Sequence, residues 1–333
     1  MMVGMSPLGS RTTSAALVAA LVGLLAGCGV TDGASSRDLL MIIPNSPGGG
    51  YDQTGRAAVK VMEEADITGG SFTVDNVVGA GGAGAMTDLV GKAGDEHTMM
   101  TVGLGVVGST YSFAAPYSLL DATPLAQLMS EPEGILVPGD SPFETVDDLV
   151  EAWTEDPGGL AVGGGSSPGG PDHLFPMQLA DEIGIDPTEV NYITYDGGGP
   201  LTTALLGEKI DVGFSGLAEF TGQVESGELR VLAVSGEQRY PDGVFAEVPT
   251  LQESGIDLVF LNWRGVLAPP DISDARRDEL IAYLQQMHDT EAWQKVLADN
   301  GWTDDFKTGD DFGDFIQEQD ERVSGTLEEL GLI

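Results

Sequence analysis

The sequence predicts an α/β protein whose mainly parallel strands carry helices on both faces. Short apolar runs alternate with stretches of helical periodicity along most of the chain, which is the rhythm of βαβ units. The 333 residues are enough for two domains of ordinary size. No repeat of fixed period is visible, so a solenoid or a propeller is not expected.

Each expected element follows from local pattern, taken in chain order. Strand candidates are apolar runs bounded by turn residues, and helix candidates have apolar residues every three or four positions. The expected strands are Leu39–Ile43, Phe72–Val77, Thr98–Val102, Leu125–Met129, Ile135–Val137, Leu160–Val162, Val190–Thr194, Asp211–Ser215, Leu229–Ser235 and Leu258–Trp263. The expected helices are Gln53–Ala65, Ala83–Gly91, Val146–Thr154, Pro171–Ile183, Leu201–Leu206 and Ala218–Ser226.

The C-terminal part of the chain is expected to be helical throughout. Residues 273–289 place apolar side chains at helical spacing, and Ser273 or Asp274 is suited to cap that helix. Two further helices are expected at 291–300 and 310–330. Their apolar stripe is expected to pack on the domain that starts the chain, as core and not as a site.

The first residues resemble a bacterial lipoprotein signal. Arg11 precedes an apolar run from Ala15 to Ala26, which is too short for a comfortable membrane span. The sequence Leu25-Ala26-Gly27-Cys28 has the small-residue pattern of a lipobox. The resemblance implies a signal peptide over residues 1–27, lipidation of Cys28, a tether over 28–37, and an anchored protein at the outer face of the cytoplasmic membrane. The alternative is an ordinary signal peptide with an incidental cysteine.

The composition excludes several classes of protein. Cys28 is the single cysteine, so neither an internal disulfide nor a cysteine-based metal site can form. The 53 acidic and 14 basic residues give a net charge of −39, which argues against nucleic acid and anionic lipid as partners. A hydrophobic content of 41% argues against a disordered acidic chain. Such an acidic surface indicates a salty medium, where screening relieves the self-repulsion.

Four glycine-rich turns fall at or near the carboxyl ends of expected strands. That edge of an α/β sheet is where ligands bind, and helix N-termini there offer free N–H groups to an anion. The alternative is four ordinary turns that need positive φ. The turns occupy residues 46–52, 78–84, 162–170 and 195–200.

Other chemistries lack their motifs. Residues 79–84 fit G-x-G-x-x-G, but the acid that should close the next strand is missing. Gly91-Lys92 is followed by alanine where a Walker A motif needs Ser or Thr, and no G-x-S-x-G elbow is present. The three histidines lack paired ligand spacing. We therefore expect no enzyme activity, no cofactor and no metal.

Individual side chains add candidates to the glycine turns. Arg264 closes the last expected strand after Asn262 and Trp263, and its guanidinium suits a ligand carboxylate; an internal salt bridge is the alternative. Tyr51 and Trp263 are suited to close over an apolar part of a ligand, although each is more often core or rim. His173 either lines the same cleft or buttresses its helix.

The order of these motifs closely resembles the Bug-type solute receptors of tripartite tricarboxylate transporters. The resemblance runs from about Leu39 to Ile333 and rests on six stretches in the family's order. They are "IIPNSPGGGYDQTGR", "VDNVVGAGGAGAMTDL", "VGGGSSPGGPDHL", "YITYDGGGPLTTALLGEKIDVGFS", "LRVLAVSGEQR" and "VPTLQESG…LNWRGVLAPPDI".

The resemblance implies a type II periplasmic-binding-protein fold with a ligand cleft between two α/β lobes. The lobes are expected at 38–134 plus 236–333 and at 135–235. Two residues depart from the family pattern: Asp196 replaces a common lysine, and Arg264 replaces an aromatic or aliphatic residue. The expected ligand-binding residues are Gly48, Gly49, Gly50, Tyr51, Asp52, Ser166, Ser167, His173, Tyr195, Gly198, Gly199, Asn262, Trp263 and Arg264.

The predicted function is an exported, monomeric receptor that captures a small carboxylate, of the di- or tricarboxylate class. It is expected to deliver this ligand to the membrane subunits of a tripartite tricarboxylate transporter. One alternative is a receptor for another small acid or amide that serves sensing. The other is an exported hydrolase, for which no motif supplies a nucleophile and base.

Overall fold

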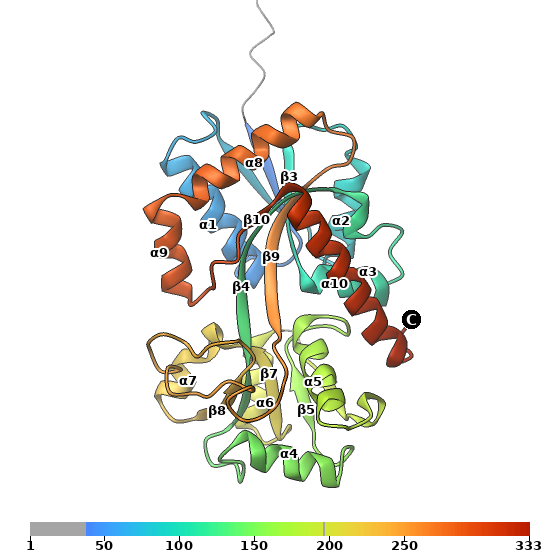
Figure 1. Ribbon diagram of the computed structural model, residues 1–333, viewed down its shortest axis with the longest axis vertical. Helices are drawn as coiled ribbons and strands as arrows, with labels where there is room; N and C mark the ends of the chain where they lie inside the picture. The colour runs from blue at the N-terminus through green and yellow to red at the C-terminus, as the bar shows by residue number, and fades with distance from the viewer. Residues whose placement is uncertain (1–37, 196) are drawn as a thin grey trace, which may run out of the picture. The chain divides into compact units, whose positions relative to one another are not determined.

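The computed structural model describes residues 38–195 and 197–333. The predicted signal peptide, the tether with Cys28, and Asp196 lie outside the described residues. Within them, ten strands join into one mixed sheet with the order β2-β1-β3-β9-β4-β7-β5-β6, and β8 and β10 both pair with β4. Helices flank the strands at both ends of β4 and β9 (Figure 1).

The N-terminal part of the chain forms a parallel βαβ arrangement. β1 lies between β2 and β3 and is parallel to both, and each connection includes a helix. This is the arrangement that the alternating sequence pattern predicts. The elements are β1 (Leu39–Ile43), α1 (Gly50–Glu64), β2 (Phe72–Asn76), a 3-10 turn at Ala80–Gly82, α2 (Ala83–Gly91), β3 (Thr98–Gly103), α3 (Leu104–Ser112) and a 3-10 turn at Leu119–Asp121.

Two long strands run through the sheet. β4 (Thr123–Pro138) pairs antiparallel with β9 (Leu261–Ala268) over Thr123–Pro132 and then with β7 from Glu133 onward. We predicted two strands here, and the structure joins them. Pro132 is tolerated because it stands where β4 leaves one partner for the other.

The middle of the chain forms the other end of the sheet, where β5 is parallel to β6 and β7. The lobe boundaries predicted above stay a prediction, because β4 passes from one end of the sheet to the other. The elements are α4 (Val146–Glu155), β5 (Val162–Gly164), α5 (Pro171–Glu182), a 3-10 turn at Pro187–Glu189, β6 (Tyr192–Thr194), α6 (Gly198–Leu206), β7 (Val212–Gly216), a 3-10 turn at Leu217–Phe220, α7 (Thr221–Glu225) and β8 (Leu229–Val234).

The C-terminal segment returns to the N-terminal elements. The helices α8 (Asp274–His288) and α9 (Glu291–Asn300) both contact α1. β10 (Lys307–Thr308) pairs with β4 and leads into α10 (Gly309–Glu329), which contacts β4, α3 and also α5. The tail therefore reaches the central elements as well as the N-terminal ones.

Two sequence expectations need correction. Helix α3 was not predicted, because residues 104 and 106–110 are all buried and a helix without a polar face has no amphipathic period. Arg264 does not end a strand: it is the fourth residue of β9, paired with Gly103 of β3 and Met129 of β4. The polar character of Asn262 and Arg264 hid the continuation of the strand.

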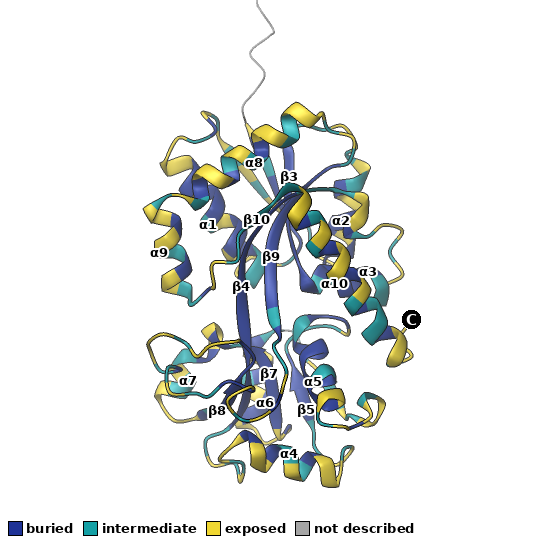
Figure 2. Ribbon diagram, in the orientation of Figure 1, coloured by how far each residue is buried: buried dark blue, intermediate teal, exposed yellow. Residues whose placement is uncertain are grey.

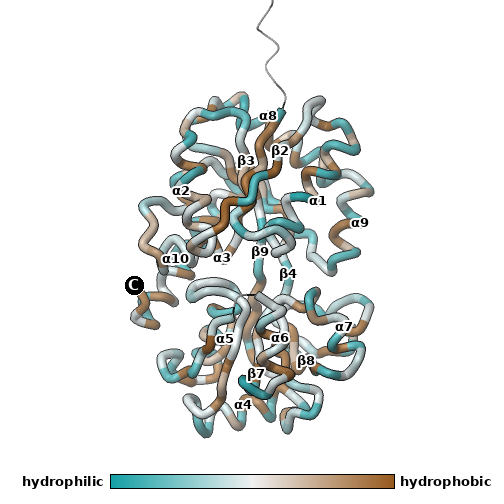
Figure 3. Tube along the Cα trace, turned by 180° about the vertical axis from the view of Figure 1, so that it is seen from behind, coloured by the Kyte–Doolittle hydropathy of each residue, from teal (hydrophilic) through white to brown (hydrophobic). Residues whose placement is uncertain are grey.

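The strands carry the core. Figure 2 shows them dark blue and the outer faces of the helices yellow, and Figure 3 shows hydrophobic stretches along the N-terminal strands. Four of the five residues of β1 are buried, Leu40 being the exception, and all six residues of β3 are buried. Among the described residues, no helix has both the length and the apolar character to cross a membrane.

Candidate functional site

A cleft of about 590 Å³ lies where the four glycine-rich turns meet. One wall comes from residues 44–46, 49–51, 78–81, 105 and 109, which we call the N-terminal wall. The opposite wall comes from residues 165–168, 170–172, 197–198, 215–216 and 219, which we call the central wall. The floor consists of Glu131, Asn262 and Arg264 from β4 and β9. Turns far apart in sequence thus line one space.

The N-terminal wall presents the start of helix α1. The amides of Gly50 and Tyr51 have no partner within the helix, and no other described residue accepts a hydrogen bond from them. The acid of the first turn, Asp52, is turned away from the cleft. Its oxygens accept hydrogen bonds from the Gly48 amide (2.8 Å), from Arg56 Nε (2.7 Å) and from Asn76 Nδ2 (2.9 Å). The helix end therefore offers its positive dipole to the cleft.

Those contacts favour the ionised form of Asp52. Burial alone would raise the pKa of Asp52, but the hydrogen bonds from Asn76, Gly48 and Arg56 outweigh it and lower the pKa. The negative charge of Asp52 is paired within the wall by Arg56.

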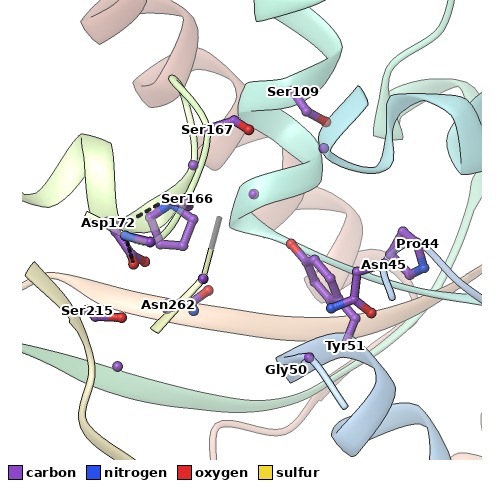
Figure 4. Close-up of a pocket in the computed structure, with 18 of the residues that line it drawn as sticks. Pro44, Asn45, Gly50, Tyr51, Ser109, Ser166, Ser167, Asp172, Ser215 and Asn262 are labelled. Carbon is purple, nitrogen blue, oxygen red and sulfur yellow. Dashed lines mark hydrogen bonds between the residues drawn. The ribbon is translucent and has the colours of Figure 1, made fainter. Parts of the chain in front are cut away.

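Tyr51 connects α1 to the start of α3. Its hydroxyl oxygen accepts a hydrogen bond from the Val106 amide at 3.2 Å. Burial raises the pKa of Tyr51 to about 12. The phenol therefore stays neutral at ordinary pH, and Figure 4 shows it beside Asn45 at the edge of the cleft.

The floor carries a buried ion pair. Arg264 Nη2 donates to Glu131 Oε1, which also accepts from Asn262 Nδ2 at 3.3 Å. The guanidinium carbon of Arg264 lies 5.9 Å from the ring centroids of both Tyr51 and Trp302. It also lies against Gly50, where an added Cβ would be 2.8 Å from Cζ. The internal salt bridge considered as an alternative for Arg264 is thus present, and Arg264 still lines the cleft.

The central wall carries two carboxylates. Asp172, in the first turn of α5, accepts a hydrogen bond from the Gly165 amide at 2.8 Å, and its own amide donates to Ser166 Oγ at 3.0 Å. Glu219 lies at the N-terminus of α6, where a Cβ added to Gly198 would be 3.1 Å from its Cδ. No described residue donates a hydrogen bond to the carboxylate of Glu219.

Burial raises the pKa of Asp172 to about 6, and the nearby Glu219 adds to the rise, whereas hydrogen bonds from Ser215 and Gly165 oppose it. Behind this wall, Glu133 is completely buried. Burial and the neighbouring Asp172 and Glu131 raise the pKa of Glu133 well above its ordinary value.

The two walls touch at one edge of the cleft. Ser112 Oγ of α3 donates to the Pro168 carbonyl at 2.8 Å, and Gly108 of α3 packs on Gly169. An added Cβ at Gly108 would lie 2.8 Å from Gly169 Cα, so only glycine allows this approach. Figure 4 shows Ser109 of the N-terminal wall and Ser167 of the central wall on the same side of the cleft.

Eight of the fourteen predicted residues line this cleft and six do not. Alternation along β9 explains Trp263: Asn262 and Arg264 face the cleft, so Trp263 faces the opposite side and packs on Phe312 and Phe315. The residues that line it are Gly49, Gly50, Tyr51, Ser166, Ser167, Gly198, Asn262 and Arg264. Those that do not are Gly48, Asp52, His173, Tyr195, Gly199 and Trp263.

His173 and Tyr195 support the central wall from behind. His173 Nδ1 accepts from the Gly169 amide at 3.1 Å, and its ring meets Tyr192 edge-on. Burial lowers the pKa of His173 to about 4, so the ring is neutral. Tyr195 packs beside Gly163.

The sequence reasoning missed several residues that line the cleft. Glu131 was not singled out, although a Glu-Pro-Glu interruption between two apolar runs was a visible signal. Ser215 lies near the carboxyl end of β7 and Glu219 follows this strand, but neither stands in a recognisable motif. The missed residues with polar side chains are Asn45, Ser46, Ser109, Glu131, Asp172, Ser215 and Glu219.

The cleft holds acceptors and donors but no metal-binding arrangement. Across the described residues, no group of three or more His, Cys, Asp or Glu side chains is placed to hold a metal ion. The chemistry that the geometry supports is recognition of a small polar molecule by backbone amides, hydroxyls and carboxylates.

Two long strands connect the two α/β ends of the sheet, and glycine-rich turns from both ends line the cleft. This arrangement is typical of solute-binding receptors. A family model, "Tripartite tricarboxylate transporter family receptor", matches residues 57–332, and the chain belongs to that family. The Bug-type resemblance is confirmed.

Relatives agree with this placement. Protein BugT of Bordetella pertussis is 27% identical over 306 residues, which cover 89% of this chain and 90% of BugT. A crystal structure of a TctC solute-binding protein from Polaromonas, without ligand, is 26% identical with a TM-score of 0.72 and covers 89% of this chain and 100% of that one. The R. palustris protein Rpa4515 with adipate has a TM-score of 0.76 at 21% identity and covers 88% and 97%. The fold is the type II periplasmic-binding-protein fold.

Proposed function

We propose that this protein is an exported receptor that captures a small carboxylate of the di- or tricarboxylate class and delivers it to the membrane subunits of a tripartite tricarboxylate transporter. The observation that carries the proposal is the open N-terminus of α1. Gly50 and Tyr51, whose amides have no partner among the described residues, line the cleft, while the helix's own acid, Asp52, is paired elsewhere. Oriented amides of this kind replace the hydration of a carboxylate without needing a cation.

The fold suits a receptor because capture requires only a shaped cleft and two positions of its walls. The Ser112–Pro168 contact joins the walls at one edge. A ligand that touches both walls favours this closed arrangement by its differential affinity, and the membrane subunits then meet a distinct surface. The adipate bound by the R. palustris relative supports a dicarboxylate as a candidate.

A screen of small acids by thermal shift, followed by calorimetry, tests the proposal. We expect at least one acid to raise the unfolding midpoint and to bind with about 1:1 stoichiometry. No shift with any mono-, di- or tricarboxylate would contradict it.

Anchoring is a separate proposal that rests on the lipobox. Changing Cys28→Ser should release the protein from membranes into the soluble fraction. Continued membrane association of that variant would reject the lipid anchor and leave the receptor proposal intact.

A further inference from the structure

The charge balance of the cleft differs from that of a simple anion site. Of the charged side chains that line it in the described part of the chain, Arg264 is the single cation. Its charge is already balanced by Glu131, with which it forms the ion pair in the floor. Both side chains are about nine-tenths buried, so solvent does little to screen the pair.

The two remaining charged groups are acids on the same wall. Asp172 and Glu219 both line the cleft, and the charge of Glu219 lies near enough to raise the pKa of Asp172. Asp172 is 7% exposed and keeps acceptor capacity beyond its bonds to Gly165 and Ser215. Glu219 stands at the N-terminus of α6 without a donor among the described residues, so that helix end already faces a carboxylate.

The walls therefore have opposite polarity. The N-terminal wall presents the positive end of α1 with its acid neutralised by Arg56. The central wall presents carboxylates at the starts of α5 and α6. Asp172 is buried and Glu219 is exposed. A ligand that fills the cleft displaces the water around both groups, and a carboxylate that loses its water without gaining a partner is costly.

We propose that the ligand is a zwitterion, with a carboxylate against the start of α1 and an ammonium group between Asp172 and Glu219. This inference deepens the proposed receptor function and rests on it. A dicarboxylate that carries an amino group satisfies both proposals. A plain dicarboxylate would place its second negative charge against two acids, with Arg264 already paired. Glu131 and Glu219 then determine specificity, since one cancels the floor cation and the other attracts the ligand cation.

Matched pairs of acids that differ by one amino group test this proposal. The pairs are aspartate with succinate and 4-aminobutyrate with butyrate, titrated calorimetrically into the protein at constant ionic strength. We expect the amino-bearing member of at least one pair to bind ten to a hundred times more tightly than its parent, as a charge-assisted contact provides. Part of the preference should persist in 1 M salt, because the contact with the buried Asp172 is weakly screened.

Three variants and one control variant test which residues cause the preference. Glu219→Gln and Asp172→Asn should each reduce the preference for the amino-bearing acid at least tenfold. Glu225→Gln removes the same charge from a residue of α7 that is exposed like Glu219 but does not line the cleft, and it should leave the preference unchanged. Glu131→Gln should shift the preference toward succinate, because it frees Arg264 for a second carboxylate.

The outcomes separate the two proposals. If succinate or butyrate binds as tightly as its amino counterpart, the zwitterion proposal is wrong and the receptor proposal stands. If Glu225→Gln changes the preference as much as Glu219→Gln does, the effect belongs to the protein's net charge and the proposal also fails. If no acid of the panel or of the wider screen binds, the receptor proposal fails and this inference with it.

Discussion

The two walls of the cleft are built from the same parts but end with opposite polarity. Each has a glycine-rich turn that leads into a helix, and each helix has an acid in its first turn. In α1, Asp52 folds back onto Arg56 and Asn76 and leaves the helix end open. In α5, Asp172 lines the cleft itself. A helix N-terminus attracts an anion only when its own acid is neutralised elsewhere, so the glycine turn alone does not define the ligand's charge.

The largest loss in the free energy of unfolding is expected from a substitution in the floor of the cleft. Arg264→Ala removes one partner of the buried pair and leaves Glu131 with an uncompensated charge. We expect a loss of about 3–5 kcal/mol in the free energy of unfolding, measured by urea denaturation. Lys295→Ala breaks an exposed pair with Asp299, at 2.6 Å with side chains 73% and 58% exposed, and should cost less than about 1 kcal/mol. Equal losses from the two variants would show that the pair in the floor is no better shielded from solvent than the surface pair.

Lowering the pH should stabilise the folded protein through Asp172 of the central wall. The pKa of Asp172 in the folded protein is about 6, above its ordinary value of 3.8, so the folded state binds the proton more tightly than the unfolded chain does. Stability therefore rises as the pH falls from above 6 toward 4, by up to about 3 kcal/mol for this group, and the penalty is fully present above pH 6.

The comparison of variants isolates this effect from the general repulsion of an acidic protein. Thermal unfolding of the wild type and of Asp172→Asn should give a shallower pH dependence in the variant between pH 4 and 6. Parallel curves would show that Asp172 is not the group that titrates. Asp52, whose pKa is lowered, contributes in the opposite direction, because its stabilising contacts are lost as the pH falls through its pKa.

The contact between the walls is sensitive to a single methyl group. Gly108→Ala places a Cβ against Gly169, and overpacking of this kind costs about 1–3 kcal/mol. If the closed arrangement is the one that binds, affinity for the best acid of the screen should fall about ten- to a hundredfold. Gly222→Ala is the matched control, since nothing lies within 4 Å of the added Cβ. An unchanged affinity in Gly108→Ala would show that the walls bind ligand without this contact.

Local pattern was enough to predict the turns that line the cleft. A strand followed by glycines and a helix leads to the carboxyl edge of the sheet whatever the distant chain does, and all four turns lie at the cleft. The alternation of β9 was also readable. Side chains two apart share a face, so Asn262 and Arg264 belong together and Trp263 belongs on the other side.

The floor was not predictable in the same way. Glu131 meets Arg264 because Glu131 pairs with Asn262 and Met129 pairs with Arg264 in the register of β4 and β9. Those residues are more than 130 positions apart, and no local signal determines which acid among 53 neutralises a given arginine. The charge of the cleft therefore depends on non-local pairing, whereas its backbone depends on local turns.

The smallest expected effect concerns the cap of α3, where the N-terminal wall again differs from the central wall. The central helices α5 and α6 meet carboxylates at their starts, but the start of α3 meets the neutral hydroxyl of Tyr51. Tyr51→Phe leaves the Val106 amide without its acceptor and should cost about 1 kcal/mol in the free energy of unfolding. Tyr283→Phe, which removes an exposed hydroxyl bonded to Glu279, should cost less. If Tyr51→Phe costs no more than Tyr283→Phe, the hydroxyl of Tyr51 does not stabilise the start of α3.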